Sequence, residues 1–197
     1  MVLSGDTIKE LIMEGFIVSS DGMTFDPQKG RDTKMLSYLL GKDGPVKSNG
    51  LDIRLGHDFK RMKTQSLPYL VASEAKSYQF EIIPPLDTGG IYLHSGEFCL
   101  ATTEEYLILP DDVMAMVDAR STLGRMGLII QTATFIQAGY KGKITLELKN
   151  EAPVPILLKP YDTIGQIVFM RLDTPTSRPY DGIYQGQDTT TAPGEKM

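Results

Sequence analysis

The stretch "GGIYLHSGEFCLATTEEYLILP", residues 89–110, contains two β-rich runs on either side of Ser95–Gly96, a pair that indicates a tight turn between two strands. Similar short runs recur from Leu51 onward, separated by Pro and Gly: "LDIRLG", "SYQFEIIPP", "KGKITLELKN", "PVPILLKP" and "IGQIVFMRL". Short strands that alternate with turn signals in this way predict a mainly β domain, either a barrel or a sandwich.

In the first residues of the chain, apolar side chains recur at the spacing of a helix and not at that of a strand. Residues 4–15, "SGDTIKELIMEG", predict a short amphipathic helix in which Ser4 caps the start and Gly15 ends the last turn. Three apolar side chains share one face of this helix: Ile8, Leu11 and Ile12. We expect loops over residues 18–50, with one more short helix around Met35–Leu40.

The chain of 197 residues is long enough for one ample domain. We expect residues 1–172 to form this domain, including the N-terminal helix. The remainder, residues 173–197, is polar and rich in Pro, Gly and Thr. This composition predicts a flexible C-terminal segment.

Composition and charge exclude several classes of protein. The net charge of −5 argues against bulk electrostatic binding to nucleic acid or to acidic membranes. No apolar run reaches transmembrane length and no signal peptide is evident, so we expect a cytoplasmic protein. The only cysteine is Cys99, which rules out an intramolecular disulfide. Together with His57 and His94 it supplies too few ligands for most zinc sites.

The stretch "ARSTLGRMGL", residues 119–128, gathers four donor side chains and no acid: Arg120, Ser121, Thr122 and Arg125. The "RSTLGR" part predicts a turn or two of helix after the "DDVMAMVDA" segment. Ser, Thr and Arg side chains together with backbone amides can bind phosphate. An exposed basic turn that contacts nothing remains an equally good interpretation of the residues alone.

A strand over residues 141–150, "KGKITLELKN", places Glu147 on a polar face. Ile144, Leu146 and Leu148 then point one way, and Glu147 points the other way with Thr145 and two lysines. A glutamate on a polar strand face is usually only solvated, so periodicity by itself does not make Glu147 catalytic.

Taken together, several segments resemble one family in their order and spacing. These are "MVLSGDTIKELIMEG", "NGLDIRLGHDF", "LHSGEFCLATTEEYLILPDDV", "ARSTLGRMGL", "TATFIQAGYKGKITLEL", "IGQIVF" and "RPYDGIYQGQ". They resemble the dCTP deaminases, which belong to the trimeric dUTPase superfamily. The resemblance implies a distorted, jelly-roll-like β-barrel with a short N-terminal helix and a few small helices. It also implies a homotrimer with active sites at subunit interfaces.

The resemblance further implies a set of functional residues. Glu147 matches the catalytic glutamate, and Ala133 matches an alanine whose backbone carbonyl helps to orient the reacting water; Ser121 and Arg125 help to hold that water. Tyr180 and Gln187 match tail residues that close over the triphosphate, so that residues 173–197 would act as a lid. The implied nucleotide-binding residues are Arg120, Ser121, Thr122, Leu123, Gly124, Arg125, Gln137, Thr145, Leu146, Gln166, Tyr180 and Gln187.

The expected reaction is deamination of dCTP to dUTP and ammonia without a catalytic zinc. One carboxylate placed near both water and base can move the required protons. Zinc deaminases instead carry H-x-E and P-C-x-x-C signatures, which this chain lacks. Mg²⁺ is expected on the substrate's phosphates, and dTTP is a candidate inhibitor. Two alternatives stay open: a bifunctional enzyme that also releases pyrophosphate to give dUMP, and a non-catalytic nucleotide-binding regulator.

Three positions depart from the family pattern. Gln137, in "FIQAG", stands where the family usually has Asp, near the deoxyribose. Ile183 stands where some members carry a lysine that contacts phosphate. The loop "RMGLIIQTA" is one residue shorter than usual. These departures bear on substrate identity and phosphate contacts more than on the fold.

Overall fold

The computed structural model describes residues 1–16, 38–63, 69–87, 89–132 and 135–195. In that part of the chain the strands are β1 (Leu51–Met62), β2 (Phe80–Ile82), β3 (Ile91–Leu93), β4 (Phe98–Ile108), β5 (Val113–Ala119), β6 (Leu128–Gln131), β7 (Lys141–Asn150), β8 (Ile156–Leu158) and β9 (Thr163–Arg171). A large sheet has the order β5-β9-β1-β4-β7-β6, with β2 beside β1, and β3 pairs with β8 in a small second sheet. All of these strand pairs are antiparallel.

The large sheet curls strongly, because β5 and β6, at opposite ends of its order, contact each other. The curled sheet encloses an apolar core that includes the fully buried Phe59, Phe169 and Leu146. The prediction of a mainly β, barrel-like domain is therefore confirmed.

The N-terminal helix α1 spans Gly5–Glu14, as its capping residues predict. The hydroxyl of Ser4 accepts a hydrogen bond from the Thr7 N–H at 3.3 Å, and Gly15 ends the helix with φ 97°. Its apolar face, formed by Ile8, Leu11 and Ile12, is buried against the barrel core. Of the second predicted helix, residues 38–40 are helical and residues 35–37 lie outside the described part.

Two strands were not predicted from the sequence. The "DDVMAMVDA" segment contains β5, and the stretch after the basic segment contains β6. A 3₁₀ helix, η1 (Ala72–Ser77), precedes β2. No helix in the described ranges combines the length and the apolar character that crossing a bilayer requires.

The C-terminal segment extends the large sheet along β7. β6 pairs only with Glu147–Asn150, which leaves the first half of that edge of β7 open. The Gly186 N–H donates to the Lys141 carbonyl and the Lys143 N–H donates to the Gln187 carbonyl, each at 2.7 Å. Gly142 permits this approach, because a Cβ there would lie 3.0 Å from the Gln187 backbone nitrogen.

Candidate active site

A cavity of about 500 Å³ lies between β7 and the C-terminal segment. Its volume falls in the range of small-molecule sites. The residues that line it are Leu100, Thr132, Phe135, Ile136, Gln137, Tyr140, Ile144, Thr145, Glu147, Tyr180, Tyr184, Gln187, Thr191 and Pro193. Three regions that are far apart in the chain therefore meet at one site: Leu100, the lining residues between 132 and 147, and those between 180 and 193.

Glu147 reaches the cavity because of the alternation of β7. Leu146 and Leu148 are fully buried in the core, whereas Thr145 and Glu147 line the cavity on the opposite face. The sequence-based orientation of Glu147 is confirmed. Leu146 was expected among the nucleotide-binding residues, but its side chain is buried in the core. Only its backbone is left to make contacts outside the core, and this backbone pairs with β4.

Aromatic side chains form much of the cavity wall. The rings of Tyr140 and Tyr180 meet edge to face, with centroids 5.4 Å apart. Tyr140 donates a hydrogen bond to the Lys143 carbonyl at 2.6 Å, and its burial raises the pKa of the phenol well above the ordinary value. Tyr140 is therefore a neutral hydroxyl at physiological pH. Aromatic walls of this kind suit the flat face of a nucleobase.

The C-terminal segment contributes polar groups as well as aromatic ones. Gln187 is buried, and its Nε2 donates to the Thr145 hydroxyl at 2.5 Å. The Thr191 hydroxyl donates to Gln187 Oε1 at 2.9 Å. Tyr180 is held by a hydrogen bond from its N–H to the Ala138 carbonyl. The structure thus brings Tyr180 and Gln187 to the same cavity as Glu147.

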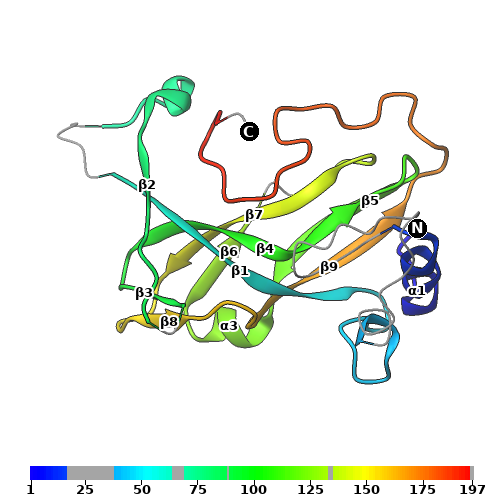
Figure 1. The fold of residues 1–197 in the computed structure, drawn as a ribbon, viewed down its shortest axis with the longest axis horizontal. Coiled ribbons are helices and arrows are strands. Elements are labelled where there is room, and N and C mark those ends of the chain that lie inside the picture. Colours follow the sequence, from blue (N-terminus) through cyan, green and yellow to red (C-terminus); the bar gives the residue numbers. More distant parts are fainter. Residues whose placement is uncertain (17–37, 64–68, 88, 133–134, 196–197) are drawn as a thin grey trace.

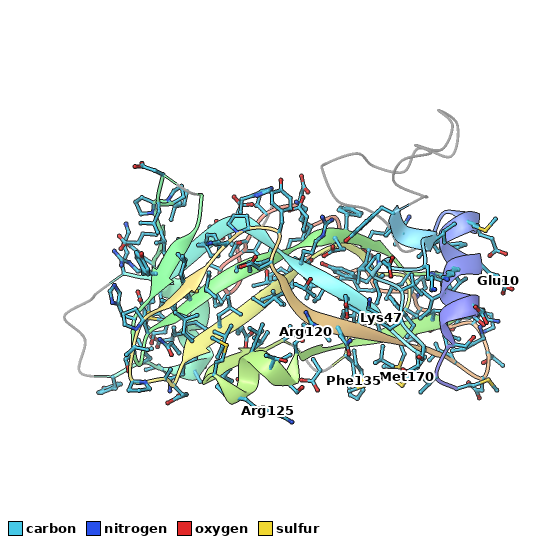
Figure 2. All side chains as sticks on the ribbon, turned by 90° about the horizontal axis from the view of Figure 1, so that it is seen from below. Glu10, Lys47, Arg120, Arg125, Phe135 and Met170 are labelled. Carbon is cyan, nitrogen blue, oxygen red and sulfur yellow. The ribbon has the colours of Figure 1, made fainter. Side chains whose placement is uncertain are left out.

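The basic segment lies elsewhere. It forms the short helix α3 (Ser121–Arg125), which follows β5 and is attached where the Arg120 N–H donates to the Ile164 carbonyl at 3.3 Å. In the view of Figure 1, α3 and the C-terminal segment lie at opposite edges of the molecule. Arg125 projects from α3 away from the body of the protein (Figure 2).

The residues of this segment expose their donors. The side chains of Arg120, Ser121, Thr122 and Arg125 are exposed, as is Gly124, and none of them lines the cavity. Leu123 is half-buried and packs against the core, so it anchors α3. The expected helical turn is confirmed, but one chain alone does not bring it to Glu147.

Gln166 belongs to the α3 side of the molecule. It lies on β9 opposite Asp118 of β5, one residue before the end of that strand. Its Nε2 donates to Asp52 Oδ1 at 2.7 Å. Each chain therefore presents two separate surfaces: the cavity, and a "donor face" made of Arg120, Ser121, Thr122, Arg125 and Gln166.

The described lining of the cavity lacks the positive charge that the phosphates of a nucleotide require. Among the described residues that line it, Glu147 is the one carboxylate and no Lys or Arg is present. The nearby Lys143 is buried below the C-terminal segment, and its Nζ lies 3.7 Å from Asp188 Oδ1. A phosphorylated ligand in this cavity needs positive charge from outside the lining.

The remaining expected positions can be located individually. Ala133 lies outside the described residues. Gln137, where the family usually has Asp, lines the cavity with an exposed side chain. Ile183 is 42% exposed on the C-terminal segment.

Part of the cavity lining carries no signal that the sequence motifs identify. Leu100 could not be found, because nothing in the sequence shows that it pairs with Glu147. Thr191 lies past the last recognisable motif. Tyr140 and Tyr184 stand inside quoted motifs, and their aromatic character was the signal that could have identified them.

Comparisons with known proteins show the family of this chain. A family model described as dCTP deaminase-like matches residues 2–172. The chain is 34% identical over 195 residues to a dCTP deaminase (dUMP-forming) of Methanothermobacter thermautotrophicus, covering 94% of this chain and 89% of the relative. It is 38% identical over 154 residues to a dCTP deaminase of Haloarcula marismortui, covering 74% of this chain and 78% of the relative.

A solved structure gives the same fold. The 2'-deoxycytidine 5'-triphosphate deaminase from Agrobacterium tumefaciens aligns with a TM-score of 0.58 and 22% identity. The alignment covers 85% of this chain and 47% of that one, so this chain spans about half its length. Since the family model extends through every strand described above, this chain belongs to the dCTP deaminase-like family.

Proposed function

We propose that the protein is a bifunctional enzyme that converts dCTP and two water molecules to dUMP, pyrophosphate and ammonia. The relative from M. thermautotrophicus, which matches nearly the whole chain, carries the name of a dUMP-forming enzyme. This favours the bifunctional alternative over the simpler expectation that the reaction stops at dUTP.

The position of Glu147 carries the proposal. It is the one carboxylate among the described lining residues of a cavity with aromatic walls, on a rigid strand paired on both sides. In the deamination step, water adds to C4 of the cytosine while Glu147 takes its proton. Glu147 delivers this proton to N3. It then takes the second proton of the added water from the C4 hydroxyl and gives it to the amino group, which leaves as ammonia while a carbonyl forms at C4. Release of pyrophosphate requires a second water at the α-phosphate.

The two surfaces of the chain support a shared site. The cavity lacks cationic lining among the described residues, whereas the donor face exposes Arg120 and Arg125 without a described ion pair. Two different surfaces that complete each other across an interface generate a closed ring when the rotation closes. We therefore propose a homotrimer in which the donor face of one subunit binds phosphates of a nucleotide held in the cavity of the next.

Magnesium fits this arrangement as a companion of the nucleotide. Mg²⁺ prefers oxygen ligands and usually binds through substrate phosphates together with one or two carboxylates. The cavity offers a single carboxylate in its described lining, too few for a resident ion. Bound on the phosphates, Mg²⁺ would neutralise their charge. Zinc is not required, since the whole sequence has two histidines and one cysteine.

The test is a panel of pyrimidine nucleotides in which every product is identified. We expect dCTP to give dUMP, pyrophosphate and ammonia in equal amounts, and dUTP to give dUMP and pyrophosphate. If dUTP accumulates from dCTP without pyrophosphate, the enzyme is a deaminase alone. Tight binding of nucleotides with no turnover of any of them would contradict both reactions and favour a regulator on this fold.

A further inference from the structure

Residues 188–195, which we call the C-terminal latch, lie beyond the last family motif and beyond the residues matched by the family model. Two contacts fix the latch to β1. The Thr190 hydroxyl, fully buried, donates to the Asp58 carbonyl at 2.7 Å. The Lys60 ammonium bonds both carboxylate oxygens of Glu195, at 3.0 and 2.7 Å.

The latch also has one hydrogen bond of its own and one to the segment that precedes it. The Ala192 N–H donates to Glu195 Oε2 at 2.7 Å, and the Gly194 N–H donates to the Tyr184 hydroxyl at 3.2 Å. The bond from Ala192, together with Lys60, holds the pKa of the Glu195 carboxyl below its ordinary value. Glu195 is therefore charged at neutral pH and can anchor the end of the latch.

Within the latch, Thr191 reaches the cavity. Its side chain is buried and lines the cavity wall. Its hydroxyl donates to Gln187 Oε1 at 2.9 Å, while Gln187 Nε2 donates to the Thr145 hydroxyl at 2.5 Å. Thr145 lies two residues before Glu147 on the same face of β7. A continuous chain of hydrogen bonds thus connects the latch to the strand that carries Glu147.

This chain of bonds orients the Gln187 side chain. A primary amide has one acceptor oxygen and two N–H donors. The Thr191 hydroxyl occupies the oxygen and Thr145 accepts one N–H, so the second N–H remains available to a ligand. Without the Thr191 hydroxyl the amide oxygen loses its buried donor and nothing distinguishes the two ends of the amide.

We propose that Thr191 is a positioning residue that turns the Gln187 amide so that an N–H meets an acceptor oxygen of the pyrimidine nucleotide, and that the latch holds Thr191 there. The role rests on the proposed function, since it concerns binding of the same nucleotide in the same cavity. The acceptor is a carbonyl oxygen of the base or an oxygen of a phosphate, which present the same chemistry to an N–H donor.

Three variants test the hydroxyl. Thr191→Val keeps the shape of the side chain and removes the donor, Thr191→Ser keeps the donor, and Thr189→Val makes the same change at an exposed neighbour. We expect Thr191→Val to lower kcat/KM for dCTP about tenfold, mostly through KM, the size of effect that one hydrogen bond gives. Thr191→Ser should recover most of this loss, and Thr189→Val should match the wild type.

The proposal is overturned if Thr191→Val retains the wild-type kcat/KM, or if Thr191→Ser is as impaired as Thr191→Val. Binding of deoxycytidine and of dCTP to Thr191→Val identifies the acceptor. Weakened binding of both assigns the N–H to the base, and weakened binding of dCTP alone assigns it to a phosphate. Unchanged binding of both also contradicts the proposal.

A second measurement does not depend on turnover. Amide hydrogen exchange across residues 186–195, without nucleotide, should be several-fold faster in Thr191→Val and in Glu195→Gln than in the wild type. If wild-type protein does not turn over dCTP, the proposed function fails. The exchange rates still test whether Thr191 and Glu195 hold the latch in place. Wild-type exchange rates in both variants would show that the latch does not hold Thr191.

Discussion

Leu100 of β4 and Glu147 of β7 are direct partners across an antiparallel strand pair, and both side chains line the same cavity. Leu100 is 5% exposed, so it gives Glu147 an apolar neighbour on the cavity floor. Directly opposite residues of adjacent strands lie close together, which fixes the two side chains relative to each other. The glutamate is therefore presented by a rigid surface rather than by a loop.

Replacement of Glu147 by Gln should abolish deamination and leave assembly intact. The amide keeps the size of the side chain and loses the proton shuttle, so we expect turnover of dCTP to fall by roughly 10²–10⁴. Ammonia release is the measurement, with sedimentation to check assembly. Glu151→Gln is the matched control, since Glu151 is exposed just past the end of β7. Near-normal turnover in Glu147→Gln would contradict the assignment.

Mixed oligomers should recover activity if sites are shared between subunits. An Arg125→Ala chain and a Glu147→Gln chain are each expected to be inactive alone. A mixed trimer has one interface at which an intact Arg125 meets an intact Glu147, so co-refolded or co-expressed chains should regain part of the activity. Mixed trimers that form and recover none would show that each chain uses its own two surfaces.

Activity should survive removal of zinc and require magnesium. The reason is the small number of His and Cys residues and the expected binding of Mg²⁺ through phosphates. The measurement is turnover with a zinc-specific chelator in excess Mg²⁺, compared with turnover after Mg²⁺ is removed. Reversible loss of activity under the chelator would be the contrary result.

The thiol of Cys99 should be inert in the folded protein. Burial, and next the nearby charge of Glu97, raise the pKa of Cys99 to about 12. In the unfolded chain its pKa is about 8.5, so between these values the unfolded state loses the proton first. The free energy of unfolding should then fall as pH rises, by up to about 1.4 kcal/mol per pH unit from this group.

Two measurements check this prediction. A thiol reagent at pH 8 should label Cys99 only after denaturant is added. The slope of unfolding free energy against pH above 8.5 should be shallower in Cys99→Ala than in the wild type. Rapid labelling of native protein, or equal slopes, would contradict the burial of the thiol.

Sequence patterns predicted the elements whose signals are local. The capping residues Ser4 and Gly15 bound α1, and alternation along β7 predicted the side on which Glu147 lies. The turn at Ser95–Gly96 separates β3 from β4 as expected. These outcomes depend on neighbours along the chain, which the sequence displays directly.

Contacts between distant segments were beyond such patterns. Lys143 was expected on an exposed polar face, yet it is 8% exposed because the C-terminal segment covers it. Thr190 and Thr191, in a run predicted to be flexible from its composition, are buried against β1 and the cavity. Whether this segment moves when nucleotide binds stays a prediction.

Removing the chain after Asp173 should leave a folded oligomer that binds dCTP weakly and turns it over poorly. Truncation deletes Tyr180, Gln187 and Thr191, which line the cavity. We expect a higher KM and a lower kcat, since closing segments exclude water and complete the site. Unchanged steady-state constants in the truncated chain would contradict a lid.

The backbone hydrogen bonds from Gly186 to Lys141 and from Lys143 to Gln187 give the C-terminal segment a second effect, on solubility. When the segment is away, the first half of β7 presents unpaired N–H and C=O groups, and such edges recruit strands of other molecules. If the segment opens as a lid, the open form would carry an aggregation risk that the closed form removes. Mutations that loosen the segment, even far from Glu147, should make the protein aggregate faster in concentrated solution. They should also slow its reaction.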